Sequence, residues 1–257
     1  MYPERIVCLA AEMPEILHAL GVLDRVVGIS AYTTRPKEAL LLPQVSGFQH
    51  GSVKRILDVG PDLAIATSTV QKELAAKLIE AGVTVLHVNP QRLEDMFTTI
   101  KLLGNVVGEA KKADQYCSQL KQEIAEIRQQ AATNPRRPKV YFEEWMDPMI
   151  AGVGWVSDLI EIAGGQDVFR ESTLKNRRAS DRVVVAQQVI DEDPDIIFAS
   201  WCGKPVVVRD IMSRDGFSEI RAVKTGAVFE VSSDVLQCGP MLIDALRSMQ
   251  GIIRNLS

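Results

Sequence analysis

The chain has 257 residues, of which 46% are hydrophobic and 24% are charged, and its formal net charge is −4. This length allows two modest cores or one large core, and the composition is that of an ordinary globular protein. The slightly acidic balance gives no reason to expect nucleic-acid binding, which needs a clustered excess of lysine and arginine. The one basic run, residues 175–182, is short and interrupted, so we interpret it as a solvated loop.

No apolar stretch of the sequence approaches the roughly 20 residues that a membrane-spanning helix requires. The chain runs from Met1 directly into a strand-like segment, without the basic start and apolar block of a signal peptide. Two expectations for its location follow: an extracytoplasmic protein whose leader was removed, or a cytoplasmic protein if Met1 is the native start. The four scattered cysteines predict free buried thiols rather than a disulfide framework.

The first part of the chain alternates between strand-like and helix-like segments. Short apolar runs predict strands, and longer segments with an apolar stripe predict helices. The expected strands cover residues 6–9, 25–29, 63–66 and 84–88, and the expected helices cover residues 12–21, 53–58 and 69–81. Because parallel neighbours need a crossover connection, this alternation predicts a parallel sheet.

The second part of the chain repeats this plan. Residues 53–66 and 186–199 each read as a short helix, a Pro-Asp pair and an apolar strand, with Pro61-Asp62 in the first copy and Pro194-Asp195 in the second. The other expected elements of this part are strands at 139–142 and 227–231 and helices at 157–163 and 239–256. The repeat therefore predicts two similar α/β lobes.

A long, mostly polar segment separates the two parts, and we expect it to form one helix. The predicted fold class is α/β, with two similar parallel-sheet lobes joined by one long backbone helix and a ligand cleft between the lobes. The expected domains are an N-terminal lobe at 1–105, the connecting helix at 106–134 and a C-terminal lobe at 135–257.

The residues that follow each strand are the candidate ligand contacts, because ligands of open parallel α/β sheets bind beyond the carboxyl ends of the strands. All three tryptophans of the chain fall in such segments: Trp145, Trp155 and Trp201. An indole has a broad apolar face and one N–H donor, which suits a large, flat and partly polar ligand. The alternative is that one or more of these indoles fill the second core. Tyr32 and the hydroxyls at residues 67–69 are candidates for the polar rim.

Several stretches together resemble a known family: residues 5–21, the two Pro-Asp units, residues 144–148, 155–165, 216–229 and 236–240. With them the whole chain resembles the helical-backbone substrate-binding proteins of ABC importers for metal chelates, above all the cobalamin-binding branch. The resemblance implies a non-enzymatic receptor, expected to be a monomer, that holds one ligand and docks on a membrane permease. It also implies that an acidic residue on each lobe pairs with the permease, and the matching positions are Glu73 and Asp210. For Glu73 the alternative is an ordinary acid at a helix N-terminus.

The ligand implied by the resemblance is cobalamin, a related corrinoid or another metal chelate, not a catalytic cofactor. The candidate ligand-binding residues are Glu12, Tyr32, His50, Thr67, Ser68, Trp145, Trp155, Trp201, Cys202 and Gln237. Among the histidines, His50 is the best candidate for an axial metal ligand, although a lone histidine is more often a surface or capping residue. A thiolate pair of Cys202 and Cys238 is a further alternative, with packing the simpler one. No protein metal site is predicted.

Three other interpretations stay open. In the first, the ligand would be a heme or a siderophore. In the second, the chain would be a cytoplasmic corrinoid carrier or sensor without a permease, and in the third it would be a chelatase-like enzyme. For the enzyme interpretation, Glu143 and Glu144 form a paired carboxylate that could do acid–base work. Adjacent residues of a strand point to opposite faces, however, so the two carboxylates are not expected to act together.

Overall fold

A computed structural model describes residues 2–47 and 51–256 of the chain. The chain divides into two compact units. The first is formed by residues 1–90 and 94–120, and the second by residues 91–93 and 121–257. Both are α/β units built around a five-stranded sheet, as the sequence predicts. None of the helices in the described ranges combines the length and the apolar character that a membrane span needs.

The sheet of the first unit is parallel throughout, with strand order β3-β2-β1-β4-β5. Its strands are β1 (Ile6–Cys8), β2 (Val26–Ser30), β3 (Gln44–Ser46), β4 (Leu63–Thr67) and β5 (Thr84–Val88). Its helices are α1 (Met13–Ala19), α2 (Val53–Asp58), α3 (Lys72–Glu80), most of α4 (Leu93–Val107) and the first half of α5 (Ala110–Ala131), with short 3-10 turns at Leu23–Arg25, Lys37–Leu41 and Thr69–Gln71.

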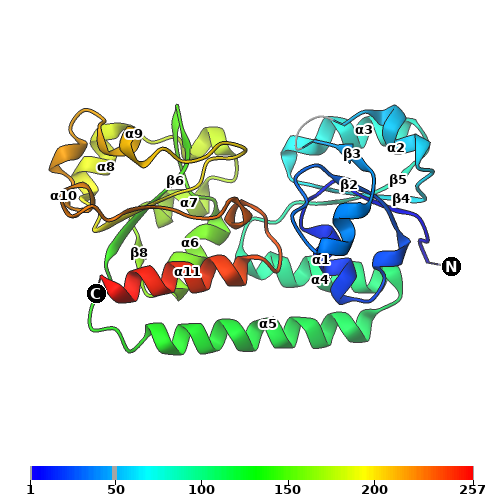
Figure 1. Cartoon of the computed structure of the whole chain (residues 1–257), viewed down its shortest axis with the longest axis horizontal. Coiled ribbons are helices and arrows are strands. Elements are labelled where there is room, and N and C mark those ends of the chain that lie inside the picture. Colours follow the sequence, from blue (N-terminus) through cyan, green and yellow to red (C-terminus); the bar gives the residue numbers. More distant parts are fainter. Residues whose placement is uncertain (1, 48–50, 257) are drawn as a thin grey trace. The chain divides into compact units, whose positions relative to one another are not determined.

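Helices cover both faces of this sheet (Figure 1). Helices α2 and α3 lie on one side, where Ile56, Leu74 and Leu78 pack against Val7 and Ala64 of the sheet. Helices α1 and α4 lie on the other side. A sheet that is buried on both faces needs apolar residues at consecutive positions, and all five residues of β4 are buried.

The second unit has strand order β10-β9-β6-β7, with β8 also pairing with β6. Its strands are β6 (Lys139–Met146), β7 (Met149–Ala151), β8 (Gln166–Asp167), β9 (Ile196–Ala199) and β10 (Val228–Glu230). Its helices are α6 (Gly154–Ile162), α7 (Arg170–Lys175), α8 (Ala186–Glu192), α9 (Val208–Met212), α10 (Arg221–Thr225), α11 (Leu242–Asn255) and the second half of α5, with 3-10 turns at Ala179–Arg182, Phe217–Glu219 and Ser233–Leu236.

One strand of the second unit departs from the predicted parallel sheet. Strand β6 continues to Met146, four residues beyond the predicted strand, and β7 returns antiparallel to it. The turn between them is Asp147-Pro148, and a short turn of this kind allows only an antiparallel return. The remaining strand pairs of this sheet are parallel, as predicted.

The Pro-Asp repeat has the same physical role in both units. The Asp62 carboxylate accepts hydrogen bonds from the backbone N–H groups of Glu4 (2.8 Å) and Arg5 (3.1 Å), at the start of β1. The Asp195 carboxylate accepts from the Lys139 N–H at 2.9 Å, at the start of β6. In both units the aspartate thus fixes the backbone at or just before the first residue of the neighbouring parallel strand, which explains why the pattern occurs twice.

The predicted connecting helix over 106–134 is wrong at its start. Helix α4 ends at Val107, Gly108 has a φ of +82°, and α5 begins at Ala110. A left-handed residue does not continue a helix, and a Cβ at Gly108 would lie 2.6 Å from the Tyr2 ring. The break is therefore specified by Gly108. Residues 110–120 of α5 belong to the first unit and residues 121–131 to the second.

Candidate ligand-binding surfaces

The first strand-end surface consists of Glu12, Tyr32 and Ser68, which follow β1, β2 and β4 of the first unit, together with Thr67, the last residue of β4. The buried side chain of Gln71 supports it from inside the unit. Its Nε2 donates to the Leu9 carbonyl oxygen and its Oε1 accepts from the Thr67 N–H, both at 2.9 Å. One amide side chain thus ties the carboxyl end of β1 to that of β4.

Glu12 precedes α1 and is only 3% exposed. Burial disfavours the charged carboxylate, and it raises the pKa of Glu12 from 4.5 to about 7. The nearby Glu12 carboxylate also adds to the effect of burial in raising the pKa of the Cys8 thiol. Glu12 lies between β1 and α1, and a buried acid there is a candidate functional residue because strongly shifted pKa values concentrate at functional sites.

Three further candidates of the first unit differ in exposure. Tyr32 is 42% exposed, so part of the residue is accessible at the surface of the unit. Thr67 is buried, while Ser68 has a φ of +55° and its hydroxyl accepts from the Val70 N–H. The predicted ligand residue His50 lies outside the described residues.

The second strand-end surface consists of Trp145, Trp155, Cys202, Lys204 and Gln237 in the second unit. Trp145 lies near the end of β6 and donates its indole N–H to the Asp147 carbonyl oxygen at 2.9 Å. Trp155 lies in the first turn of α6, not in the irregular turn that the sequence predicts, and donates to the Val235 carbonyl oxygen at 2.9 Å. Both indoles are half-buried, with the N–H satisfied.

Trp201 does not belong to this surface. It is 2% exposed and packs in the core with Ile211 and Phe217, and its indole donates to Glu143 Oε1 at 3.1 Å. The prediction that its indole packs on the ligand is therefore not supported by its position, and the core-filling alternative describes it. The reason is the buried Glu143 carboxylate, which offers the indole N–H an acceptor inside the unit.

Two arginines that the sequence did not single out hold the paired carboxylates. Arg214 contacts both oxygens of Glu143, with Nη2–Oε1 at 2.9 Å, and the carboxylate is fully buried. Arg182, 4% exposed, contacts both oxygens of Glu144 at 2.5 and 3.1 Å and also the Ala151 carbonyl oxygen. Each carboxylate has its own guanidinium, so the two serve as anchors of the β6–β7 hairpin rather than as a free acid–base pair.

The other predicted residues are placed as follows. Cys202 is exposed in the turn after β9, whereas Cys238 is buried with its Sγ 3.7 Å from the Arg92 carbonyl oxygen. Gln237 Oε1 is buried and accepts no hydrogen bond from the described part of the chain. Within residues 2–47 and 51–256, no group of three or more His, Cys, Asp or Glu side chains is arranged to hold a metal ion.

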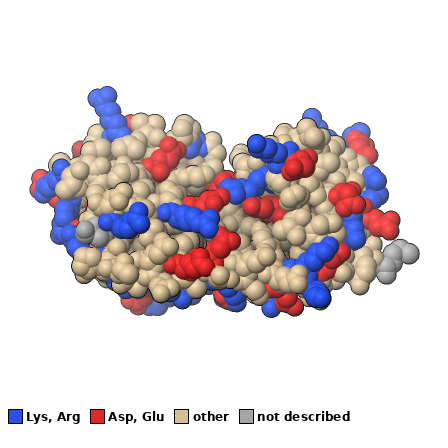
Figure 2. Space-filling model, turned by 60° about the horizontal axis from the view of Figure 1, so that its bottom comes forward, with Lys and Arg blue, Asp and Glu red and all other residues tan. Residues whose placement is uncertain are grey.

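The predicted docking acids are both exposed and both lie in the first turn of a helix. Glu73 is in α3 and Asp210 is in α9. The helix dipole favours an acid in the first turn of a helix. The position of Glu73 is therefore equally consistent with an ordinary acid at a helix N-terminus. On the face shown in Figure 2, basic and acidic side chains are both distributed over each unit.

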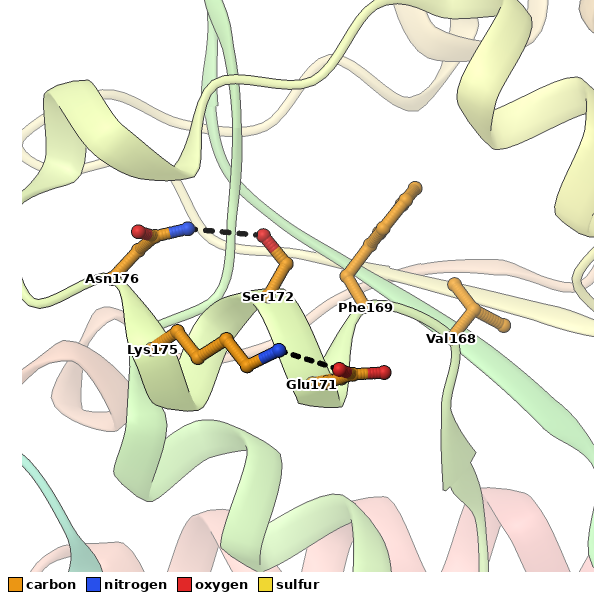
Figure 3. Close-up of a pocket in the computed structure, with 6 residues that line it drawn as sticks. All are labelled: Val168, Phe169, Glu171, Ser172, Lys175 and Asn176. Carbon is orange, nitrogen blue, oxygen red and sulfur yellow. Dashed lines mark hydrogen bonds and ion pairs between the residues drawn. The ribbon is translucent and has the colours of Figure 1, made fainter.

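A shallow hollow beside α7 is distinct from the strand-end surfaces. Figure 3 shows that its polar side chains pair with one another: Lys175 Nζ lies 2.6 Å from Glu171 Oε1, and Asn176 Nδ2 lies 3.1 Å from Ser172 Oγ. Its lining residues are Val168, Phe169, Glu171, Ser172, Lys175 and Asn176. Because these polar groups satisfy each other along one helix, the hollow has no distinct chemistry for a ligand.

Two α/β units, each with polar or aromatic side chains at the carboxyl ends of its strands, are the organisation of a ligand-binding protein. The chain belongs to the family described as Periplasmic binding protein, whose model matches residues 6–235. It is 29% identical to YvrC of Bacillus subtilis, an uncharacterized ABC transporter substrate-binding lipoprotein, over 96% of this chain and 79% of that protein. It is 27% identical to the vitamin B12-binding protein of Vibrio cholerae, over 96% of this chain and 87% of that protein.

Solved structures share the fold over nearly the whole chain. The periplasmic vitamin B12-binding protein BtuF of Vibrio cholerae matches with a TM-score of 0.78 and 25% identity, covering 99% of this chain and 98% of that one. The periplasmic heme-binding protein RhuT of Roseiflexus matches with a TM-score of 0.84 and 24% identity, covering 98% of both chains. The predicted α/β fold class with two units, and the predicted family, are therefore confirmed.

Proposed function

We propose that this chain is the substrate-binding protein of an ABC importer and that its ligand is a metal chelate, with cobalamin or a related corrinoid as the first candidate. The observation that carries the proposal is the relationship to a vitamin B12-binding protein over 96% of this chain. The substrate-binding lipoprotein of Bacillus subtilis, related over the same share, supports the importer part. A heme or an iron chelate is the second candidate ligand, because a heme-binding protein shares the fold.

The two strand-end surfaces have the chemistry that such a ligand needs. In the second unit, Trp145 and Trp155 are half-buried indoles with satisfied N–H groups, so their remaining exposed surface suits a macrocycle. In the first unit, the exposed Tyr32 and the Ser68 segment supply polar groups for a ligand rim. That one ligand contacts residues of both units stays a prediction, and single variants on each surface test it.

We propose that preorganised strand ends contribute to the affinity for the ligand. Gln71 fixes two strand ends of the first unit, and the Glu143–Arg214 pair anchors the β6–β7 hairpin in the second. Groups that are already ordered lose less conformational entropy when a ligand binds. Binding without catalysis is part of the proposal, and the separate pairing of Glu143 and Glu144 supports it.

The partner is proposed to be a membrane permease, contacted through Glu73 and Asp210, and the location is proposed to be extracytoplasmic. The exposure of both acids supports a docking role. The name of the Bacillus subtilis relative, a lipoprotein, supports the location. A monomer remains the expected state.

Titration of the purified chain with cyanocobalamin, dicyanocobinamide, hemin and a ferric siderophore, followed by tryptophan fluorescence, tests the proposal. Saturable quenching by one of them, with a dissociation constant below about 1 µM (about −8 kcal/mol), is the expected result. Tyr32→Ala and Trp155→Ala should each weaken that binding if both units contribute, while Tyr2→Ala is the matched control. The absence of binding to all four chelates would refute the proposal.

A further inference from the structure

We propose that Lys204, together with the Trp145 ring, forms a subsite for an acidic side group of the ligand, a carboxylate or a phosphate ester carried on the chelate. This inference rests on the proposed function, since it specifies the chemistry of the same ligand. The Lys204 Nζ lies 5.1 Å from the centroid of the Trp145 ring, and the lysine side chain is exposed. Both residues lie at the carboxyl end of the central strands β6 and β9.

The Lys204 ammonium is not neutralised by the described part of the protein. No carboxylate among residues 2–47 and 51–256 lies within 4.0 Å of Nζ, whereas Arg182 and Arg214 of the same region are each bound to a glutamate. An ammonium has three donors, and a ring face beneath it engages the charge without accepting a conventional hydrogen bond. Its donors are therefore available for an anionic acceptor.

The turn that carries Lys204 is fixed on both sides. At its start, the Trp201 indole is bound to the buried Glu143 carboxylate, and the Lys204 N–H donates to the Trp201 carbonyl oxygen at 3.2 Å. After the turn, the Val206 N–H donates to Glu230 Oε1 at 3.1 Å. These three bonds restrain the backbone around Lys204, which reduces the entropy lost on binding.

The chemistry selects ligands with an acid group next to an apolar plane. The ammonium forms a charge-assisted hydrogen bond with a carboxylate or phosphate oxygen, and the neighbouring indole offers surface to the macrocycle or its alkyl groups. A chelate whose rim carries only amides or esters can pack on the indole but cannot form the charge-assisted hydrogen bond with the ammonium. We therefore expect discrimination between acidic and neutral forms of one chelate.

Two matched ligand pairs test this subsite. Hemin carries carboxylates that its dimethyl ester lacks, and cyanocobalamin carries a phosphodiester that dicyanocobinamide lacks. Calorimetry at low salt compares the parent chain with Lys204→Gln. The variant should bind the acidic member of each pair about fivefold to tenfold more weakly than the parent does, and its affinity for the neutral member should change by no more than about twofold. Lys204→Arg should keep most of the affinity, and Lys175→Gln, on α7, is the control for the same change of charge.

The pair that responds identifies the acid as a carboxylate or a phosphate. Equal weakening of both members by Lys204→Gln, or no weakening of either, would overturn the subsite while leaving the proposed function intact. If the parent binds no chelate, the proposed function is wrong and the subsite falls with it. The parent's own binding curve therefore separates the two failures.

Discussion

Replacing Glu12 with glutamine should change how the stability of the protein depends on pH. Glu12 is 3% exposed, and burial raises its pKa from 4.5 to about 7. As pH rises between these values, the unfolded chain releases the Glu12 proton while the folded chain retains it, so unfolding is favoured. The contribution to stability is complete below about pH 4.5 and is lost as pH rises to about 7. The difference between the two pKa values corresponds to about 3 kcal/mol.

Urea unfolding of the parent and of Glu12→Gln, compared from about pH 4 to about pH 8, measures this contribution. Because all other titrating groups are shared, the difference between the two free energies of unfolding isolates residue 12. We expect that difference to shift in favour of Glu12→Gln by about 3 kcal/mol between the two ends of the range. Glu73→Gln, at an exposed position of the same unit, is the control.

A constant difference between the parent and Glu12→Gln at every pH would refute this reasoning. It would mean that Glu12 ionises equally readily in the folded and unfolded chain, and that its carboxyl group is effectively solvated. A shift of the opposite sign would mean that the folded protein stabilises the charged form.

Three further predictions concern packing and binding. Arg214→Met should lower the free energy of unfolding, measured with urea, by about 3–5 kcal/mol, because it leaves the buried Glu143 carboxylate without its guanidinium. A loss no larger than that of the exposed control Arg209→Met would contradict this prediction. Gly108→Ala should cost about 1 kcal/mol more than Gly82→Ala in the same assay: both glycines have positive φ, but only at Gly108 does a Cβ meet a ring. Trp155→Ala should weaken chelate binding about tenfold, whereas Trp201→Phe should lower the melting temperature and largely retain binding; the reverse result would place Trp201 at the ligand.

Local patterns predicted the repeated units because one physical requirement occurs twice. Asp62 and Asp195 both fix the start of a neighbouring strand, so the same short helix, Pro-Asp pair and strand recur in the sequence. The break between α4 and α5 was also readable, since Gly108 is the signal for it. The polar character of the surrounding segment concealed it, because a polar run predicts an exposed helix but not its continuity.

The contacts that decide the second strand-end surface are distant in sequence. Arg182 lies 38 positions from Glu144, Arg214 lies 71 positions from Glu143, and Trp201 lies 58 positions from Glu143. No local periodicity relates such residues, so their pairing follows only from the fold. Trp201 follows a strand in sequence and looks like a surface residue for that reason, but its indole reaches inward to Glu143.

The most direct test of the central claim is a calorimetric titration of the full chain with cyanocobalamin, with hemin titrated in parallel. We expect one binding event with a stoichiometry of about one chelate per chain and a dissociation constant below about 1 µM for at least one of the two. If neither chelate produces a saturable heat, while a ligand that contains no metal does, the chain binds a different class of substrate and the claim is contradicted.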